Sequence, residues 1–383
     1  MSASTALRGV LTGSVIARIV LGWVAVALLS LASGFLTGSL SMPLVFTLLA
    51  LIVGVIIACS GGVVTQAEYL AHRLGDPYGT LVLTLSIVGI EVILISAVML
   101  GPGDHHTIAR DSVMATVMIV LNLVIGLALI VGGMRHNNLQ VNRAGISAYL
   151  SMLVVLIATA FAIPAVIGTD GAYNTAQAIT IVTLTVILYA FFLYRQTGAQ
   201  HADFTETDKD VVASGDVHGT ELRPGIGAIF REHKGEIFAR AMVLLITVIP
   251  IVLLSHDMAS LLDDGLNRLG APIALSGIII AMIVFLPEAI TTVRAAWGGE
   301  GQRVVNLAHG ALVSCVGLTL PVVLIIGLLT GQTVTLAENP TNLLLLGISL
   351  ALSIATFNSR KVTAIHGGAH LFVFILYALS IFS

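Results

Sequence analysis

The chain has 383 residues, of which 57% are hydrophobic and only 10% are charged, and its formal net charge is −3. Soluble domains carry about 25% charged residues, so this composition, with a mean hydropathy of +1.03, excludes an ordinary soluble enzyme. Without a basic surplus, a nucleic-acid-binding protein is excluded as well. Outer-membrane barrels consist of short alternating segments, whereas the apolar runs here are long and continuous. The sequence therefore predicts an all-α, polytopic membrane protein.

Eleven segments are long and apolar enough to cross a bilayer, which requires about 20 mostly apolar residues. In chain order they are approximately 15–35, 43–65, 78–100, 111–133, 147–168, 175–194, 238–255, 272–297, 304–329, 341–358 and 362–382. Turn-forming and charged residues separate them. A cleaved signal peptide would need a shorter apolar core than the first run has, so we expect a first membrane helix there.

The distribution of basic residues predicts the orientation. If the spans alternate, the side that holds the N-terminus receives 15 of the 17 Lys and Arg residues, and the other side receives only Arg110 and Arg268. Cytoplasmic loops collect Lys and Arg. We therefore expect a cytoplasmic N-terminus and, after eleven spans, a C-terminus outside.

A short internal repeat accompanies the third and eighth spans. Arg73-Leu74-Gly75-Asp76-Pro77 recurs as Arg268-Leu269-Gly270-Ala271-Pro272, each just before an apolar helix with one carboxylate. Five spans separate the two units, so they enter the membrane from opposite sides. The predicted organisation is an N-terminal segment with the first helix (1–36), a five-helix repeat (37–195), an acidic cytoplasmic loop (196–236) and an inverted second repeat (237–383). The loop is either a solvated linker or a weak cation or pH sensor.

Two carboxylates lie deep inside apolar segments. Glu91 has 14 uncharged residues before it and 12 after it, and Glu288 has 19 before it and five after it. An ionised group at mid-bilayer costs about 2.5–3.5 kcal/mol on insertion scales, and both burial and a like charge nearby favour the protonated form of a carboxyl group. We expect the pair either to hold protons or to release them and hold a cation, which is the basis of cation/proton exchange. The alternative is a protonated Glu that merely joins two helices.

Hydroxyl groups could complete the shell of a bound cation, which needs further oxygen ligands. Thr291 and Thr292 follow Glu288 by three and four residues and so share its helix face. Thr84 precedes Glu91 by seven residues. Each of these threonines could instead bond only to its own backbone.

Other polar residues in the spans have two interpretations, helix packing or function. Asn122 lies in the fourth span and Ser314 in the ninth, together with His309, whose imidazole is suited to proton handling. His366 and His370 are four residues apart on the last helix, but no glutamate accompanies them in the metalloprotease pattern, so we expect no metal site there.

In these residues the chain resembles the cation/proton exchanger family of the calcium/cation antiporter superfamily, and in particular its bacterial sodium/calcium–proton antiporters, which also handle potassium. The stretch Ala71-His72-Arg73-Leu74-Gly75-Asp76-Pro77-Tyr78-Gly79, which leads to Glu91, is similar to the first signature repeat. Phe285-Leu286-Pro287-Glu288, with residues 305–310 and Pro321, is similar to the second. The likeness extends over most of the chain and implies a location in the plasma (inner) membrane of a bacterium.

The resemblance also implies roles for individual residues. The two acids that bind cation and proton fall on Glu91 and Glu288, a repeat-one asparagine on Asn122, a repeat-two glutamine on Ser314, and a glycine on Gly310. The signature Gly-Asn-Ala-[Thr/Ala]-Glu, however, reads Ile87-Val88-Gly89-Ile90-Glu91 and Val284-Phe285-Leu286-Pro287-Glu288 here, so both signature asparagines are missing.

The sequence therefore predicts a secondary active antiporter, not an enzyme, that exchanges cytoplasmic Ca²⁺ or Na⁺, with K⁺ as a further candidate, for H⁺ by alternating access. The expected partners are inorganic cations, protons and the lipid bilayer, with no nucleic acid and no cofactor. A cation channel that uses the same carboxylates is the main alternative. An intramembrane enzyme built on His309, His366 and His370, and a sensor or scaffold, are the others.

Overall fold

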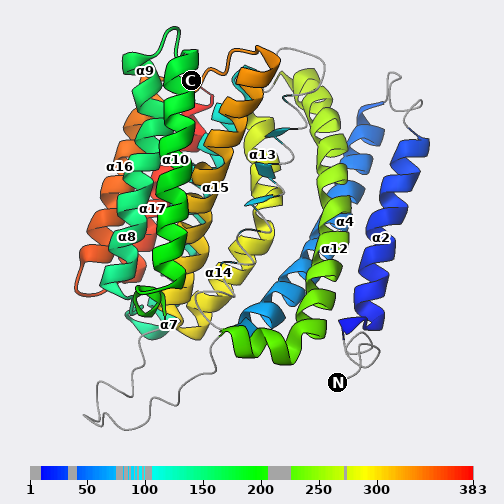
Figure 1. The fold of residues 1–383 in the computed structure, drawn as a ribbon. Coiled ribbons are helices and arrows are strands. Elements are labelled where there is room, and N and C mark those ends of the chain that lie inside the picture. Colours follow the sequence, from blue (N-terminus) through cyan, green and yellow to red (C-terminus); the bar gives the residue numbers. More distant parts are fainter. Residues whose placement is uncertain are drawn as a thin grey trace.

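The computed structural model describes residues 10–32, 41–74, 106–205, 226–270 and 274–382, and nine single positions between 81 and 99. These residues are helical apart from short connections (Figure 1). The elements are α2 (Gly13–Leu31), α4 (Met42–Leu74), α6 (Ile108–Met118), the π-helix η1 (Ile119–Val124), α7 (Ile125–His136), α8 (Arg143–Ile157), the π-helix η2 (Ala158–Ala162), α9 (Ile163–Ile167), α10 (Thr175–Thr197), the 3₁₀-helix η3 (His201–Phe204), α12 (Ile226–Leu269), α13 (Ala274–Val284), α14 (Leu286–Gly298), α15 (Gly301–Thr330), α16 (Pro340–Asn358) and α17 (Ala364–Ser380).

Eight of the described helices are long and apolar enough to cross a membrane, which confirms the prediction of an all-α, multi-pass membrane protein. The other predicted spans also coincide with helix: the nine positions between 81 and 99, the pair α13 and α14, and the shorter α17. The count of eleven stays a prediction. It agrees with the arrangement in Figure 1, where α2 begins at one end of the bundle and α17 ends at the other.

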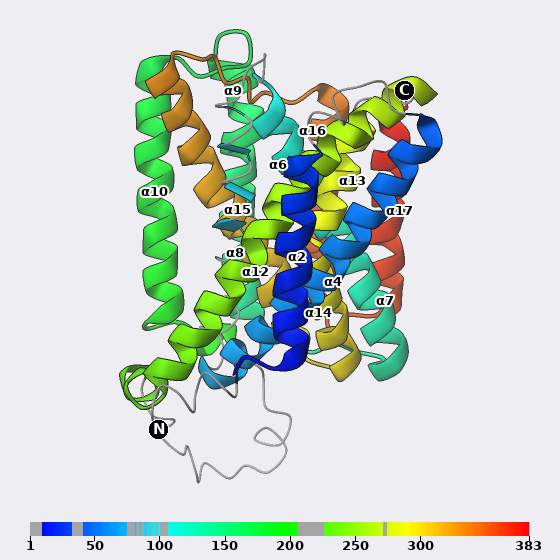
Figure 2. The ribbon, with the colours of Figure 1, turned by 90° about the vertical axis from the view of Figure 1, so that its right-hand side faces the viewer.

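The helices form two groups. Helices α2, α4 and α12 pack on one another at one side, and Figure 2, which views the molecule from that side, shows α2 in front of the other two. The larger group surrounds α15, with α10 packed along α15, and α17 packed along α7 and η1. Helices α13 and α14 lie between the groups (Figure 1), because they contact α4 on one side and α6, α7 and α15 on the other.

Burial follows the expectation for a bilayer protein. Helix α15 is buried over most of its surface and is rich in Leu, Val and Gly, which is the pattern of a helix at the centre of a bundle. Helix α10, by contrast, exposes large apolar side chains such as Ile179, Leu184 and Phe191. These exposed side chains mark a surface that faces lipid.

Glycines bring α7 and α17 into backbone contact. A Cβ atom on Gly367 would lie 2.5 Å from the Gly126 carbonyl oxygen, and one on Gly133 would overlap the backbone of Ala364. Small residues at such crossings are the usual means by which membrane helices approach closely. The contact fixes η1, which continues into α7, against α17.

Helix α12 is longer than the predicted span 238–255. It begins at Ile226, so residues 226–236 belong to a helix and not to the predicted loop, and it continues to Leu269. Salt bridges of the i,i+4 type, Arg240 to Glu236 and Arg268 to Asp264, stabilise its polar ends. Hydropathy marks where the membrane ends and not where the helix ends, which explains the difference. Residues 206–225, with most of the acidic residues of the predicted loop, lie outside the described residues.

Candidate functional site

Two buried carboxylates lie near one another in the interior. Glu91 is one of the described helical positions between 81 and 99 and is 3% exposed, and Glu288 is 4% exposed in the first turn of α14. The two groups are close enough to interact electrostatically. Residues almost 200 positions apart, one from each half of the chain, thus share one apolar environment.

A break in the eighth predicted span positions Glu288. Helix α13 ends at Val284, Phe285 has backbone angles of φ −84° and ψ 1°, and α14 begins at Leu286 with a proline in its first turn. Pro287 lacks the N–H that would continue α13 without interruption. Glu288 therefore lies at the N-terminal, electropositive end of a half-helix. Discontinuous helices of this kind form ion and substrate sites in many transporters.

Glu91 is held by two neighbours. Thr116 Oγ1 donates a hydrogen bond of 3.0 Å to Glu91 Oε1, and the Cys315 thiol also hydrogen-bonds this carboxylate. Within the described residues, Glu91 Oε2, both carboxylate oxygens of Glu288 and the Thr292 hydroxyl have no hydrogen-bond partner. Leaving a buried polar atom unpaired costs about 1–3 kcal/mol. The arrangement therefore favours a ligand that these oxygens can bind, either protons or a cation.

The other predicted ligands lie in different places. Thr291 and Thr292 are both buried on the helix of Glu288. Asn122 lies in η1, where its Nδ2 donates to Ser349 Oγ over 2.8 Å. Thr84 lies outside the described residues. Their roles in binding a cation stay predictions.

The residues of α15 point toward different neighbours. Ser314 Oγ accepts a hydrogen bond of 3.0 Å from the Tyr189 hydroxyl on α10. Gly310 faces the Tyr149 hydroxyl, which would lie 3.2 Å from a Cβ at this position. His309 packs edge-on against Phe357 of α16, with a ring separation of 5.0 Å. The pocket roles predicted for Ser314, Gly310 and His309 stay predictions.

Sequence reasoning missed two residues that contact Glu91. Cys315 lies inside an apolar run, which gives no sign that its thiol donates a hydrogen bond. Thr116 carries a hydroxyl in the same span as Asn122 and precedes it by six residues. A systematic inspection of hydroxyl and thiol side chains near mid-span could have identified both.

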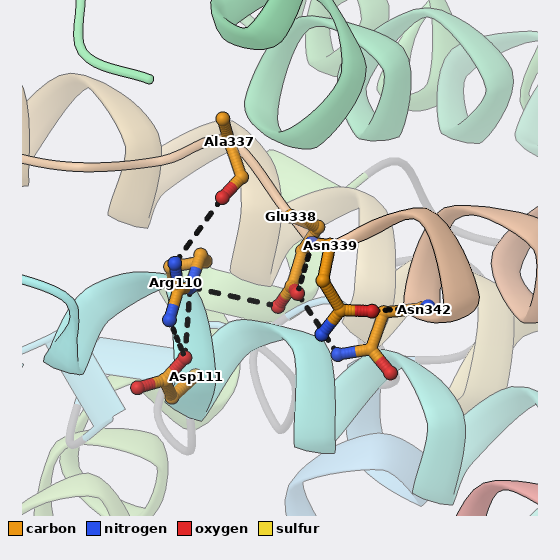
Figure 3. Close-up of polar contacts among 6 residues, drawn as sticks. All are labelled: Arg110, Asp111, Ala337, Glu338, Asn339 and Asn342. Carbon is orange, nitrogen blue, oxygen red and sulfur yellow. Dashed lines mark hydrogen bonds and ion pairs between the residues drawn. The ribbon is translucent and has the colours of Figure 1, made fainter. Parts of the chain in front are cut away.

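An ion-pair network lies near the start of α6. Figure 3 shows Arg110 between Asp111, at 2.8 Å, and the segment before α16, where it donates to the Ala337 carbonyl over 3.2 Å and lies 3.8 Å from Glu338. Asn342 donates to Glu338 over 2.8 Å. Burial raises the pKa of Glu338, and the contacts with Asn342 and Arg110 oppose this effect. The network ties the start of α6 to the start of α16.

Comparison with known proteins identifies the family of this chain. The sodium/calcium exchanger protein family matches residues 44–198 and 239–382. The chain belongs to this family. The sodium-potassium/proton antiporter ChaA of Escherichia coli K12 is 30% identical over 356 residues, which are 93% of this chain and 94% of that relative.

Solved structures have the same fold. Native YfkE is 19% identical with a TM-score of 0.67, and the match covers 95% of this chain and 99% of that one. The H⁺/Ca²⁺ exchanger CAX is 14% identical with a TM-score of 0.67, and the match covers 95% of this chain and 87% of that one. These likenesses confirm the predicted fold class. Membership in an exchanger family also favours antiport over the alternatives of a channel and an intramembrane enzyme.

Proposed function

We propose that this member of the sodium/calcium exchanger family is a secondary antiporter that exports cations from the cytoplasm in exchange for protons. The observation that carries the proposal is the pair Glu91 and Glu288, buried together with three of their four oxygens unpaired among the described residues. Two adjacent carboxylates in an apolar environment are unstable when both are charged and empty. They therefore bind protons or a cation, but not both at once, and this competition couples the two fluxes.

We propose Na⁺ or K⁺ as the main transported cations. Calcium takes six to eight oxygen ligands, and the described oxygens beside the acids come from Glu91, Glu288, Thr116 and Thr292. The similarity to ChaA, which is named for sodium, potassium and protons, supports the same choice. Calcium is the second candidate, because two solved structures with this fold are named as a Ca²⁺/H⁺ antiporter (YfkE) and an H⁺/Ca²⁺ exchanger (CAX).

Alternating access would arise from movement between the two helix groups. Helices α2, α4 and α12 form one body, and the broken pair α13 and α14, which carries Glu288, lies at its contact with the other. We propose that the repeats 37–195 and 237–383 are inverted, with a cytoplasmic N-terminus and an outside C-terminus in a bacterial inner membrane. Helix α10 in the sixth predicted span packs along α15 in the ninth, and α17 in the eleventh span packs along α7 in the fourth. A repeat of five spans relates the first of these pairs to the second, so their similar packing supports the symmetry expected for inverted transporter repeats.

The proposal is tested by transport in inverted membrane vesicles that hold a pH gradient. Na⁺, K⁺ and Ca²⁺ are added separately, and dissipation of the gradient is followed with a pH-sensitive dye. We expect Na⁺ or K⁺ to dissipate the gradient with the wild-type chain, and neither to do so with Glu91→Gln or Glu288→Gln. Glu338→Gln, which changes a buried carboxylate outside the membrane helices, is the matched control and should retain exchange. Exchange that persists in either of the first two variants would refute the assigned role.

A further inference from the structure

A second set of buried polar side chains lies where α15, α16, α17 and η1 meet. We call it the histidine cluster, and it consists of His309, His370, Thr356, Ser353, Ser349 and Asn122, all with 0% exposure. His366, which is partly exposed, lies one turn before His370 on α17. The mechanism described above uses none of the histidines.

The histidines follow one another from the helix end toward the interior. His370 interacts electrostatically with His366 on its own helix and with His309 on α15. Its Nε2 lies 3.4 Å from Thr356 Oγ1 on α16. Because α17 begins at Ala364, His370 lies about 9 Å along the helix from the junction between α16 and α17. The charge bias of the sequence places this junction on the cytoplasmic side.

Hydroxyl groups continue the series toward mid-membrane. Ser349, Ser353 and Thr356 are spaced by four and three residues, so they lie on one face of α16. Ser349 Oγ, which accepts from Asn122 Nδ2, lies about 14 Å along α16 from the helix end at Asn358. Asn122 in turn shares a continuous helix with Thr116, the donor to Glu91, about 9 Å away along the axis.

Several polar atoms of the cluster have no hydrogen-bond partner among the described residues. They include Asn122 Oδ1 and Ser353 Oγ. The Leu121 carbonyl hydrogen-bonds the His370 ring and the Val305 carbonyl hydrogen-bonds the His309 ring, so His309 keeps one ring nitrogen without a partner among these residues. Polar groups that only join helices would bond one another across the interface. Unpaired groups that are fully buried instead bind water, which typically makes about three hydrogen bonds in such places.

The cluster lacks the groups that hold a metal cation. The sequences of η1, α15, α16 and α17 contain no Asp or Glu. Arg360 and Lys361, in the connection between α16 and α17, are both exposed at its cytoplasmic end and repel cations. Protons differ from metal ions in this respect, because a neutral imidazole accepts a proton at one ring nitrogen and releases another from the second, so that it ends uncharged.

We propose that the histidine cluster is a hydrated proton path from the cytoplasmic end of α17 to the buried acids, separate from the route of the metal cation. The inference rests on the proposed antiport function. His366 exchanges protons with the cytoplasm, His370 and His309 pass them inward, and water held by Thr356, Ser353, Ser349 and Asn122 carries them to Glu91. Intramembrane polar residues of this kind mark proton relays in other pumps and transporters.

Two modes of transport by the purified chain in liposomes separate this path from the cation site. The first mode is proton release driven by the cation that the vesicle assay identifies, and the second is isotopic self-exchange of that cation at equal pH, which needs no proton movement. We expect His370→Asn and His309→Asn to slow proton-coupled exchange by about 10-fold or more, and to leave self-exchange within about twofold of wild type. His136→Asn, which changes a histidine on α7 outside the cluster, should alter neither mode.

Unchanged proton-coupled exchange in both variants would overturn the proposal, as would an equal loss of both modes in variants that elute like wild type. If a histidine variant does not fold, Ser353→Ala removes one hydroxyl of the path, and the same two outcomes apply to it. Failure of the proton path is distinguishable from failure of the antiport function. If only the proton path is wrong, Glu91→Gln is still inactive in both modes. If the antiport function itself is wrong, Glu91→Gln is active.

Discussion

Replacing Arg110 by methionine should destabilise the protein at neutral and alkaline pH, and much less at acidic pH. The Glu338 side chain is 2% exposed, and its ion-pair partner Arg110, at 3.8 Å, is 22% exposed. Removing one partner of a fully buried pair costs about 3–5 kcal/mol, and an exposed pair contributes about 0–1 kcal/mol. Because the Arg110–Glu338 distance is long for an ion pair and Arg110 is partly exposed, we expect the substitution to lower the free energy of unfolding by about 2 kcal/mol, between these limits.

The pH dependence follows from the pKa of Glu338, which burial raises above its ordinary value of 4.5. A carboxyl group with a raised pKa contributes its full stability below the unfolded value, and this contribution is lost as the pH rises through the folded pKa. Arg110 limits the loss by stabilising the charged form. Without Arg110 the pKa of Glu338 rises further, so the cost of the substitution is largest when the pH exceeds that pKa. Near pH 4.5, only the lost hydrogen bond to Ala337 and the lost, partly exposed ion pair with Asp111 should remain.

Thermal unfolding of the detergent-purified chain, followed by the fluorescence of Trp23 and Trp297, measures this effect. For Arg110→Met at about pH 8, a loss of about 2 kcal/mol corresponds to a midpoint lower by about 2–3 °C for a chain of 383 residues. In a Glu338→Gln background, where residue 338 cannot ionise, the same substitution should have only a small effect at any pH. An equal drop at both pH values, or an undiminished drop in the Glu338→Gln background, would refute the reasoning.

Two further predictions concern the membrane helices. A Cys59→Ala chain keeps Cys315 as its single cysteine, and this buried thiol contacts Glu91. Alkylation of Cys315 should therefore inactivate exchange, and an excess of the transported cation should slow the alkylation. Complete labelling with full activity would contradict this. Gly367→Ala should lower stability by about 1–3 kcal/mol because its Cβ would meet the backbone of α7, whereas Gly368→Ala, with open space around it, should not. Equal unfolding midpoints for these two variants would argue against the close α7–α17 crossing.

Much of the fold could be predicted from the sequence because a bilayer imposes a simple rule on every span. Each predicted segment coincides with helix in the described residues, and the largest difference is at α12, where the helix continues into polar sequence. Charged pairs such as Glu236 and Arg240 lower hydropathy but stabilise the helix that contains them. Hydropathy therefore locates a membrane span better than it locates the end of a helix.

The site was only partly predictable. Glu91 and Glu288 are identifiable because a charge inside an apolar run is costly and rare. The directions of Ser314, Gly310 and His309 were not identifiable, because these residues lie in the buried part of α15, which has no polar face to orient it. The break between α13 and α14 has a sequence signal in Pro287, whereas the π-helix that holds Asn122 has none. Which polar residues meet is decided by packing between helices that are distant in sequence.

The central claim is that protons and metal cations compete for one pair of buried acids. The most direct test is proton release at equilibrium, with the purified chain in weakly buffered detergent near neutral pH and a pH indicator. Addition of NaCl or KCl should release protons from the wild-type chain in proportion to protein, whereas choline chloride should release none. The double variant Glu91→Gln/Glu288→Gln should show no release above the choline baseline. Undiminished release from that variant would contradict the account.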